Sequence, residues 1–189
     1  MKTFIEIGSC DFDTNIPLIE TGNWKGIMIE PSPNYFDSLS KIVDKIKNKE
    51  NLTLDNHVIS DYEGEIKFKT SLNTKDLWVR GISSVSDVNH KGEKLFDIPI
   101  NKKFIDKELS LPCTTLDKII EKYNVDKIDY LKIDAEGHEM NILDCYSWSI
   151  LPDIIKLEHT HIDDINISNI LKAKDYIVYT EERDIYAIR

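Results

Sequence analysis

An apolar segment of strand length, residues 128–133, is followed at once by side chains that can transfer protons. They are three carboxylates and one imidazole: Asp134, Glu136, His138 and Glu139. Because open α/β sheets bind ligands at the carboxyl ends of their strands, this layout places acid/base groups at a ligand-binding edge. Residues 134–139 therefore form a candidate active site.

The four side chains are not equivalent candidates. Glu139 stands where the next helix should begin, and a helix dipole stabilises a carboxylate there, so we expect a structural role. Asp134 ends the strand and is the first candidate to orient an acceptor or take its proton. Glu136 is kept as a further catalytic candidate, and the role of His138 stays open.

Glu158 and His159 follow another predicted strand, residues 153–158, and are candidate general bases. His159 and His161 form an H-x-H pattern that is followed by aspartates, as in the metal loop of metallo-β-lactamase-like hydrolases. No later histidine in the chain completes such a ligand set. We therefore predict no metal site, although one divalent ion held by oxygen and nitrogen is compatible with the pattern. The remaining histidines are assigned surface or structural roles: His57, His90 and His161.

A glycine and a glutamate near the N-terminus are spaced as in a nucleoside site. Gly8 follows the first predicted strand, where it permits a tight turn and a close ligand approach. Glu30 ends the second predicted strand, where a carboxylate can accept both hydroxyls of a ribose. The loop lacks the other glycines of G-x-G-x-x-G, and its aspartates, Asp11 and Asp13, would repel a pyrophosphate.

An acidic loop suits a cofactor that has an adenosine and a positive charge but no phosphate. S-adenosylmethionine, with its sulfonium, α-ammonium and ribose, meets these conditions. A structural turn would also explain Gly8 and Glu30 taken alone; the two aspartates favour the cofactor interpretation. Ser60 and Asp61 follow the third predicted strand and could contact adenine, although an aspartate turn that caps the strand explains them equally well.

Strand and helix patterns alternate along the chain, which predicts an α/β fold with a mostly parallel, doubly wound sheet and an antiparallel C-terminal strand. The predicted strands are residues 3–7, 26–30, 52–59, 65–69, 128–133, 153–158, 176–180 and 185–189. The predicted helices are residues 14–22 with Thr14 as N-cap, 33–46, 116–123 with a cap at Thr114 or Thr115, 138–146 and 164–173.

Residues 65–69 are expected to form a hairpin with the preceding strand. Residues 71–110 show little periodicity, and we interpret them as an irregular insertion, a candidate lid, within a single domain 1–189.

Composition limits the classes of function. The chain has 189 residues, is 41% hydrophobic and carries a net charge of −10, which argues against a nucleic-acid binder. Its start lacks a signal-peptide core, and no apolar run is long enough to span a membrane. Three cysteines without C-x-x-C spacing indicate reduced thiols. We expect a cytoplasmic protein with no membrane partner.

Five short motifs resemble those of the FkbM-type methyltransferases. In chain order they are Phe4-Ile-Glu-Ile-Gly-Ser, Ile29-Glu-Pro-Ser-Pro, Ser60-Asp, Thr115-Leu-Asp and Leu131-Lys-Ile-Asp-Ala-Glu-Gly-His-Glu. Their order and spacing match from about residue 3 to residue 160, and the K-I-D-x-E-G-x-E string is the specific one.

The resemblance implies a Rossmann-like methyltransferase fold that uses S-adenosylmethionine, usually to methylate hydroxyl oxygens of sugars or natural products. It places Asp134 beside the reacting methyl group and Ser60-Asp61 near the adenine, with Glu30 and Pro31 at the ribose. The methionine moiety would lie against Glu6 and the following loop: Gly8, Ser9, Cys10, Asp11, Asp13 and Thr14.

One difference from the family concerns this loop, where many relatives have alanine-asparagine-x-glycine and this chain has Ser9-Cys10-Asp11-Phe12. Because the loop has fewer glycines, a second hypothesis stays open, namely that the protein binds a nucleoside cofactor but is catalytically inactive. A nicotinamide-dependent oxidoreductase is disfavoured by the same missing glycines and by the acidic loop. The expected partner is a small-molecule or carbohydrate acceptor, and a homo-oligomer that completes the substrate pocket is compatible with the sequence.

Overall fold

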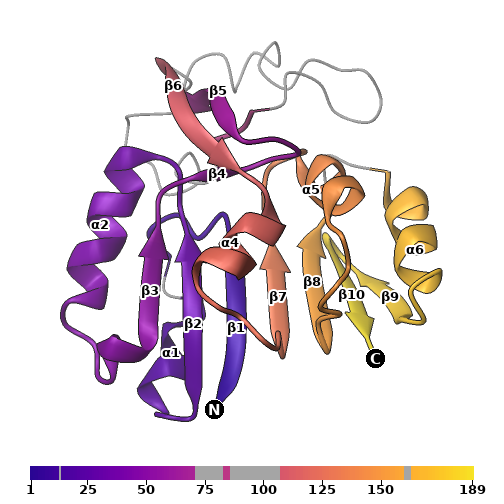
Figure 1. Cartoon of the computed structure of the whole chain (residues 1–189), viewed down its shortest axis with the longest axis horizontal. Helices are drawn as coiled ribbons and strands as arrows, with labels where there is room; N and C mark the ends of the chain where they lie inside the picture. The colour runs from indigo at the N-terminus through magenta and orange to yellow at the C-terminus, as the bar shows by residue number, and fades with distance from the viewer. Residues whose placement is uncertain (13, 71–82, 86–106, 160–162) are drawn as a thin grey trace.

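The computed structural model describes residues 1–12, 14–70, 83–85, 107–159 and 163–189, and every structural statement below refers to them. Seven strands form the main sheet in the order β3-β2-β1-β7-β8-β10-β9 (Figure 1). They are β1 (Lys2–Ile7), β2 (Trp24–Ile29), β3 (Leu52–Asp55), β7 (Tyr130–Ile133), β8 (Ile154–Glu158), β9 (Ile177–Glu181) and β10 (Asp184–Ile188).

Strand β10 is antiparallel to both of its neighbours, and the other strands run parallel to one another. The α/β fold class is therefore confirmed, including the antiparallel C-terminal strand. Because β10 runs against the others, its end reaches the edge of the sheet at which β1 begins. Both chain ends consequently lie at the same edge (Figure 1).

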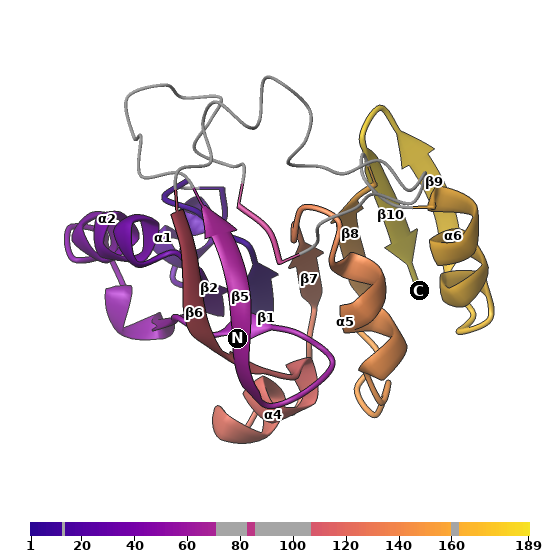
Figure 2. The same ribbon diagram turned by 90° about the horizontal axis from the view of Figure 1, so that it is seen from above.

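Helices cover both faces of the sheet (Figure 2). The helices on one face are α1 (Ile16–Glu20) and α2 (Pro33–Val43), and those on the other are α4 (Leu116–Lys122), α5 (Glu139–Cys145) and α6 (Asp164–Lys172). A short 3-10 helix, η1 (Lys49–Asn51), precedes β3.

Successive side chains of β1 point to opposite faces of the main sheet and pack against the helices on each face. Phe4 is buried with the apolar side chains of α1 and α2, while Ile5 and Ile7 are buried with those of α4, α5 and α6. Glu6, between the two isoleucines, points to the same face as Phe4 and is fully buried.

A second, three-stranded sheet lies beyond the carboxyl edge of the first (Figure 1). Its strands are β4 (Val58–Ile59), β5 (Gly64–Thr70) and β6 (Lys107–Thr114), in the order β4-β6-β5. Strand β5 pairs with β6 in an antiparallel ladder, and β4 pairs with β6 in parallel. The isolated segment 83–85 adjoins β5 through a bridge between Ser84 and Lys69.

This second sheet corrects two predictions. Residues 52–59 do not form one strand, because the chain turns after Asp55, whose carboxylate accepts hydrogen bonds from the backbone N–H of His57 and the side chains of Lys122 and Tyr123. Residues 65–69 form no hairpin with that strand either. They pair with β6, which lies partly inside the segment expected to be irregular. Apart from residues 83–85, the rest of the candidate lid lies outside the described residues.

The helix boundaries follow local capping. Thr115 caps α4 by accepting the N–H of Lys118, as expected of one of the two threonines. The N-cap of α1 is Asn15 and not Thr14, because the Thr14 hydroxyl donates to Glu6 instead. Among the described helices, none combines the length and the apolar character that crossing a membrane requires.

Gly8 lets the first loop approach β7. Its φ is +79°, and a Cβ built there would lie 1.8 Å from the carbonyl oxygen of Asp134. Gly22 has a similar φ of +74°, but the nearest atom to its Cβ position is the amide nitrogen of Asn48 at 3.4 Å. A substitution at Gly22 therefore measures the cost of the left-handed conformation alone, whereas a substitution at Gly8 adds the cost of a clash with the backbone of Asp134.

We expect Gly8→Ala to lower the free energy of unfolding by more than about 3 kcal/mol, because β1 and β7 would have to move apart. Gly22→Ala, the control, should cost about 1–2 kcal/mol, the price of the left-handed conformation alone. Urea unfolding monitored by circular dichroism measures both. Equal losses in the two variants would contradict the close approach at Gly8.

Candidate functional site

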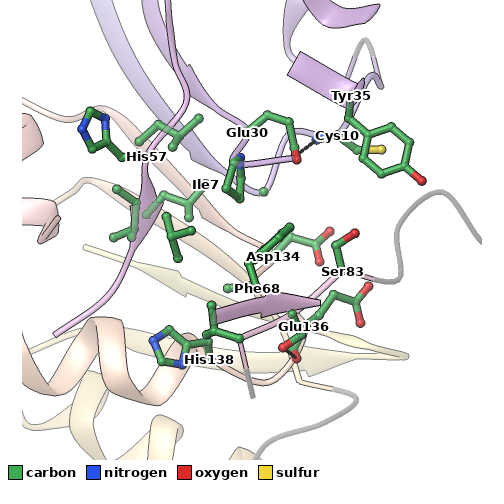
Figure 3. A pocket seen from close by; sticks show the side chains of 18 of the residues that line it. Ile7, Cys10, Glu30, Tyr35, His57, Phe68, Ser83, Asp134, Glu136 and His138 are labelled. Carbon is green, nitrogen blue, oxygen red and sulfur yellow. Dashed lines mark hydrogen bonds between the residues drawn. The ribbon is translucent and has the colours of Figure 1, made fainter. Parts of the chain in front are cut away.

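A cavity lies at the carboxyl edge of β1, β2 and β7, under the second sheet (Figure 3). It encloses about 640 Å³ of space, part of which is open to solvent. His57 and His138 lie toward one end, and Tyr35, Cys10, Ser83 and Glu136 toward the other. Apolar side chains form much of the wall: Ile7, Ile29, Val58, Ile59, Phe68 and Val85.

Glu30 brings a buried carboxylate to this cavity. Its side chain follows β2, is 4% exposed and accepts two backbone hydrogen bonds, from Cys10 at 2.7 Å and from Ser32 at 2.7 Å. Burial raises the pKa of Glu30 to about 7, against the effect of these two donors. Each oxygen keeps a further lone pair, so the carboxylate can accept donors from a ligand such as the hydroxyls of a diol.

Cys10 adopts a left-handed conformation with φ of +52°, which directs its N–H toward Glu30. Few residues other than glycine, asparagine and aspartate adopt this conformation readily. Burial raises the pKa of the Cys10 thiol, so this thiol stays protonated at neutral pH. Its contribution to the wall is therefore geometric rather than nucleophilic.

Glu6 does not line the cavity. Its carboxylate accepts hydrogen bonds from the Thr14 hydroxyl at 2.6 Å, the Asn15 amide at 2.9 Å and the Lys132 ammonium at 2.7 Å. Lys132 is the register partner of Glu6 across β1 and β7. Glu6 and Thr14 thus fix the far end of the first loop.

Asp134 follows β7 and faces the cavity close to two other carboxylates. One oxygen each of Asp134, Glu136 and Glu158 can be chosen so that all lie within 4.8 Å of one another. Burial, followed by the negative charge of Glu136, raises the pKa of Asp134 to about 7, and Lys132 acts in the opposite direction. The spacing of the three carboxylates would suit an oxygen-ligated divalent cation.

Glu139 shapes the loop that carries these carboxylates. It is 1% exposed and accepts the N–H of Ala135 at 2.7 Å and that of Gly137 at 3.0 Å. Glu136 and Gly137 both have positive φ values, +49° and +95°, so the loop turns sharply around the Glu139 side chain. Glu139 therefore has a structural role, and it acts on the preceding loop as well as at the helix terminus.

His138 lines the cavity and contacts Ser60 behind the wall. The Ser60 hydroxyl donates to Asp61, so its oxygen accepts the Nε2–H of His138 at 3.0 Å. Burial lowers the pKa of His138 to about 4, which keeps the imidazole neutral. Ser60 is fully buried and Asp61 is exposed, and neither forms part of the wall.

The structure places some of the predicted site residues in the cavity wall and others outside it. Six of them lie in the cavity wall: Gly8, Cys10, Glu30, Pro31, Asp134 and Glu136. Others lie behind or beside it: Glu6, Ser9, Asp11, Thr14, Ser60, Asp61, Glu158 and His159. The Nε2 atom of His159 is buried without a hydrogen-bond partner among the described residues. Asp13 lies outside the described residues.

Several wall residues were missed by sequence reasoning. Val58 and Ile59 directly precede Ser60, so their position at a strand end was a usable signal, and the same holds for His57. Phe68 and the segment Ser83–Val85 reach the cavity only because β5 pairs with β6 and Ser84 pairs with Lys69. No local pattern predicts such long-range pairing.

Solved structures share this fold. The methyltransferase FkbM from Methylobacillus flagellatus has a TM-score of 0.62 at 15% identity, and the match covers 98% of this chain but 43% of that one. TrmK from M. capricolum, solved with S-adenosyl-homocysteine, has a TM-score of 0.54 at 9% identity, with 99% and 60% covered. The precorrin-6y C5,15-methyltransferase from Geobacter metallireducens has a TM-score of 0.51 at 12% identity, with 100% and 81% covered.

The chain thus spans less than half of the length of the FkbM structure that it resembles. Comparison with curated protein sequences gives no match. The sequence does match the Methyltransferase FkbM domain over residues 6–178, a range that begins at the end of β1 and includes the residues that line the cavity and β7. The chain therefore belongs to the FkbM methyltransferase family.

Proposed function

We propose that this chain transfers a methyl group from S-adenosylmethionine to a hydroxyl oxygen of a sugar or another small polar acceptor. The observation that carries the proposal is the placement of two carboxylates, Glu30 and Asp134, on one cavity at the carboxyl edge of the sheet. Two carboxylates in different surroundings can do different work, one in binding and one in proton transfer.

The chemistry of the wall fits the cofactor. Glu30 can accept hydrogen bonds from the two ribose hydroxyls. The apolar side chains of the wall, Val58 and Ile59 among them, offer a surface for an adenine ring. The carboxylates at the other end suit a cation better than a phosphate, because they would repel a pyrophosphate. When bound, S-adenosylmethionine supplies a methyl group already activated by a sulfonium.

Asp134 is the proposed base. With a pKa near 7 it is partly ionised at neutral pH, and it is a stronger base than an ordinary aspartate. The same carboxylate can orient an acceptor hydroxyl and take its proton as the oxygen is methylated. Glu136 and Glu158 would support this role by holding the pKa of Asp134 high. His159 remains a second candidate base from the end of β8.

The shape of the first loop argues against a protein that has lost cofactor binding. Phe12 stands at the position of the relatives' second glycine and has no positive φ, so the turn does not need a glycine there; the left-handed residue is Cys10, whose N–H holds Glu30 in place. Cys10 stands where many relatives have asparagine, which is the residue after glycine that tolerates this conformation best.

The three cysteines are free thiols, which supports a cytoplasmic location.

The acceptor substrate is expected to be neutral or cationic, since an anionic group would be repelled by the carboxylates of Asp134 and Glu136.

Replacing Glu30 by glutamine should weaken S-adenosylhomocysteine binding by about 10- to 100-fold, because the ribose loses hydrogen bonds to an ionised acceptor. Affinity for the wild-type protein should fall as the pH drops below about 7, where Glu30 takes up a proton. The variant should show a weaker dependence, because of the two cavity carboxylates with a pKa of about 7 only Asp134 then titrates in this range. Calorimetry at pH 6, 7 and 8 measures this. The control is Glu20→Gln, an exposed glutamate at the end of α1. Unchanged affinity in Glu30→Gln would remove the ribose assignment.

Asp134→Asn should lower turnover by at least about 100-fold while cofactor affinity stays within a few fold, because an amide cannot take the proton. Wild-type turnover should rise between pH 6 and pH 8 as Asp134 loses its proton. Release of S-adenosylhomocysteine with a panel of hydroxylated acceptors is the assay. Asp144→Asn, an exposed aspartate on α5, is the control. Full activity in Asp134→Asn would exclude Asp134 as the base.

Chelation should leave turnover unchanged, because the sulfonium activates the methyl group without a Lewis acid and Asp134 takes the proton directly. The measurement compares turnover before and after treatment with EDTA and dialysis. A loss of activity that Mg²⁺ or Mn²⁺ restores would instead make Asp134, Glu136 and Glu158 metal ligands.

A further inference from the structure

A chain of hydroxyl groups runs from behind the cavity wall to Ser83, which lines the cavity. The hydroxyl of Ser32 lies 3.3 Å from that of Thr70, which lies 2.8 Å from that of Ser83. Ser32 and Thr70 are fully buried and do not line the cavity. Ser32 is also the N-cap residue of α2, yet its hydroxyl makes no capping bond and pairs with Thr70 instead.

The two ends of this chain reach opposite sides of the cavity. At one end, the N–H of Ser32 donates to Glu30 at 2.7 Å. At the other end, Ser83 is followed by Ser84, whose hydroxyl donates to the carbonyl of Glu136 at 2.7 Å. Ser84 is also held by two backbone bonds of 3.0 Å with Lys69, the residue before Thr70.

Segment Ser83–Val85 therefore forms a ceiling that contacts the loop of Glu136 directly, through Ser84, and is linked to the loop of Glu30 through Thr70 and Ser32. It lines the cavity together with Glu30, which follows β2, and with residues of the loop after β7. That loop has two consecutive positive φ values at Glu136 and Gly137, so its shape depends on the hydrogen bonds that hold it. The bond from Ser84 is one of them.

We propose that Thr70 is a positioning residue whose hydroxyl, through Ser83 and Ser84, couples cofactor binding at Glu30 to the arrangement of the catalytic loop at Asp134–Glu136. A ligand that fixes Glu30 fixes Ser32 and, through Thr70, the ceiling. The ceiling then holds the Glu136 carbonyl, and with it the turn beside Asp134. Coupling of this kind lowers the ordering cost that the acceptor side must meet when the cofactor is already bound.

Thr70 is the sharpest position to test, because it touches the network without touching the cavity. Thr70→Val keeps the branched shape and the strand preference but removes the hydroxyl. Thr70→Ser keeps the hydroxyl and serves as the conservative rescue. The control is Thr53→Val on β3, since no hydrogen bond of the Thr53 hydroxyl is found among the described residues.

We expect Thr70→Val to weaken S-adenosylhomocysteine binding by about three- to tenfold in calorimetry, the loss of about one hydrogen bond, while Thr70→Ser stays within twofold of wild type. Hydrogen exchange gives a second readout. The cofactor product should slow exchange at Ala135 and Gly137 in the wild type and in Thr70→Ser, and should do so far less in Thr70→Val.

Wild-type affinity and wild-type protection in Thr70→Val would overturn the inference, as would equal weakening in Thr70→Ser. If Thr70→Val does not fold, Ser84→Ala provides the test, because it cuts the contact with Glu136 and should abolish the protection at Gly137. The inference rests on the proposed cofactor site, and different results would contradict the site and the coupling. A normal affinity of Glu30→Gln would remove the site itself, whereas an impaired Glu30→Gln with a normal Thr70→Val would remove the coupling alone.

Discussion

The buried ion pair between Glu6 and Lys132 is the contact on which the site depends. It joins the two central strands directly below the point where both turn into functional loops. A carboxylate without exposed surface is costly unless every oxygen is satisfied, and Glu6 meets this with a cation and two neutral donors. The pair therefore holds β1 and β7 in register and also fixes the end of the first loop through Thr14 and Asn15. Loss of either partner would leave an uncompensated charge in the middle of the sheet.

The two carboxylates of the cavity are held by different means, and this explains their different roles. Glu30 is fixed by two backbone N–H groups, so its position depends on the left-handed turn at Cys10. Burial raises the pKa of Asp134 as it does that of Glu30, and the negative charges of Glu136 and Glu158 add to the shift at Asp134. The two groups therefore share a raised pKa and differ in what holds them, because backbone donors fix Glu30 whereas Asp134 lies beside two further carboxylates.

The sequence predicted what local patterns encode. The strand-to-carboxylate step at Asp134, the strand end at Glu30 and the parallel order of the sheet all follow from apolar runs and turn residues. The second sheet was not predictable in this way, because β5 and β6 are separated by a long segment and pair through contacts that no short window contains. Glu6 was placed at the cofactor by resemblance, but its carboxylate pairs with Lys132, which is distant in sequence. The hydroxyl chain at Thr70 was invisible for the same reason.

The antiparallel course of β10 has a practical consequence for experiments on this protein. It returns the C-terminus to the edge at which β1 starts, so both chain ends lie away from the second sheet and the cavity (Figure 1). An affinity tag, a fluorescent reporter or a sensor surface attached at either end would therefore lie at the opposite edge of the sheet from the cavity (Figure 1). Immobilised protein should bind ligands as the free protein does, which makes surface-based acceptor screening a suitable route to the substrate.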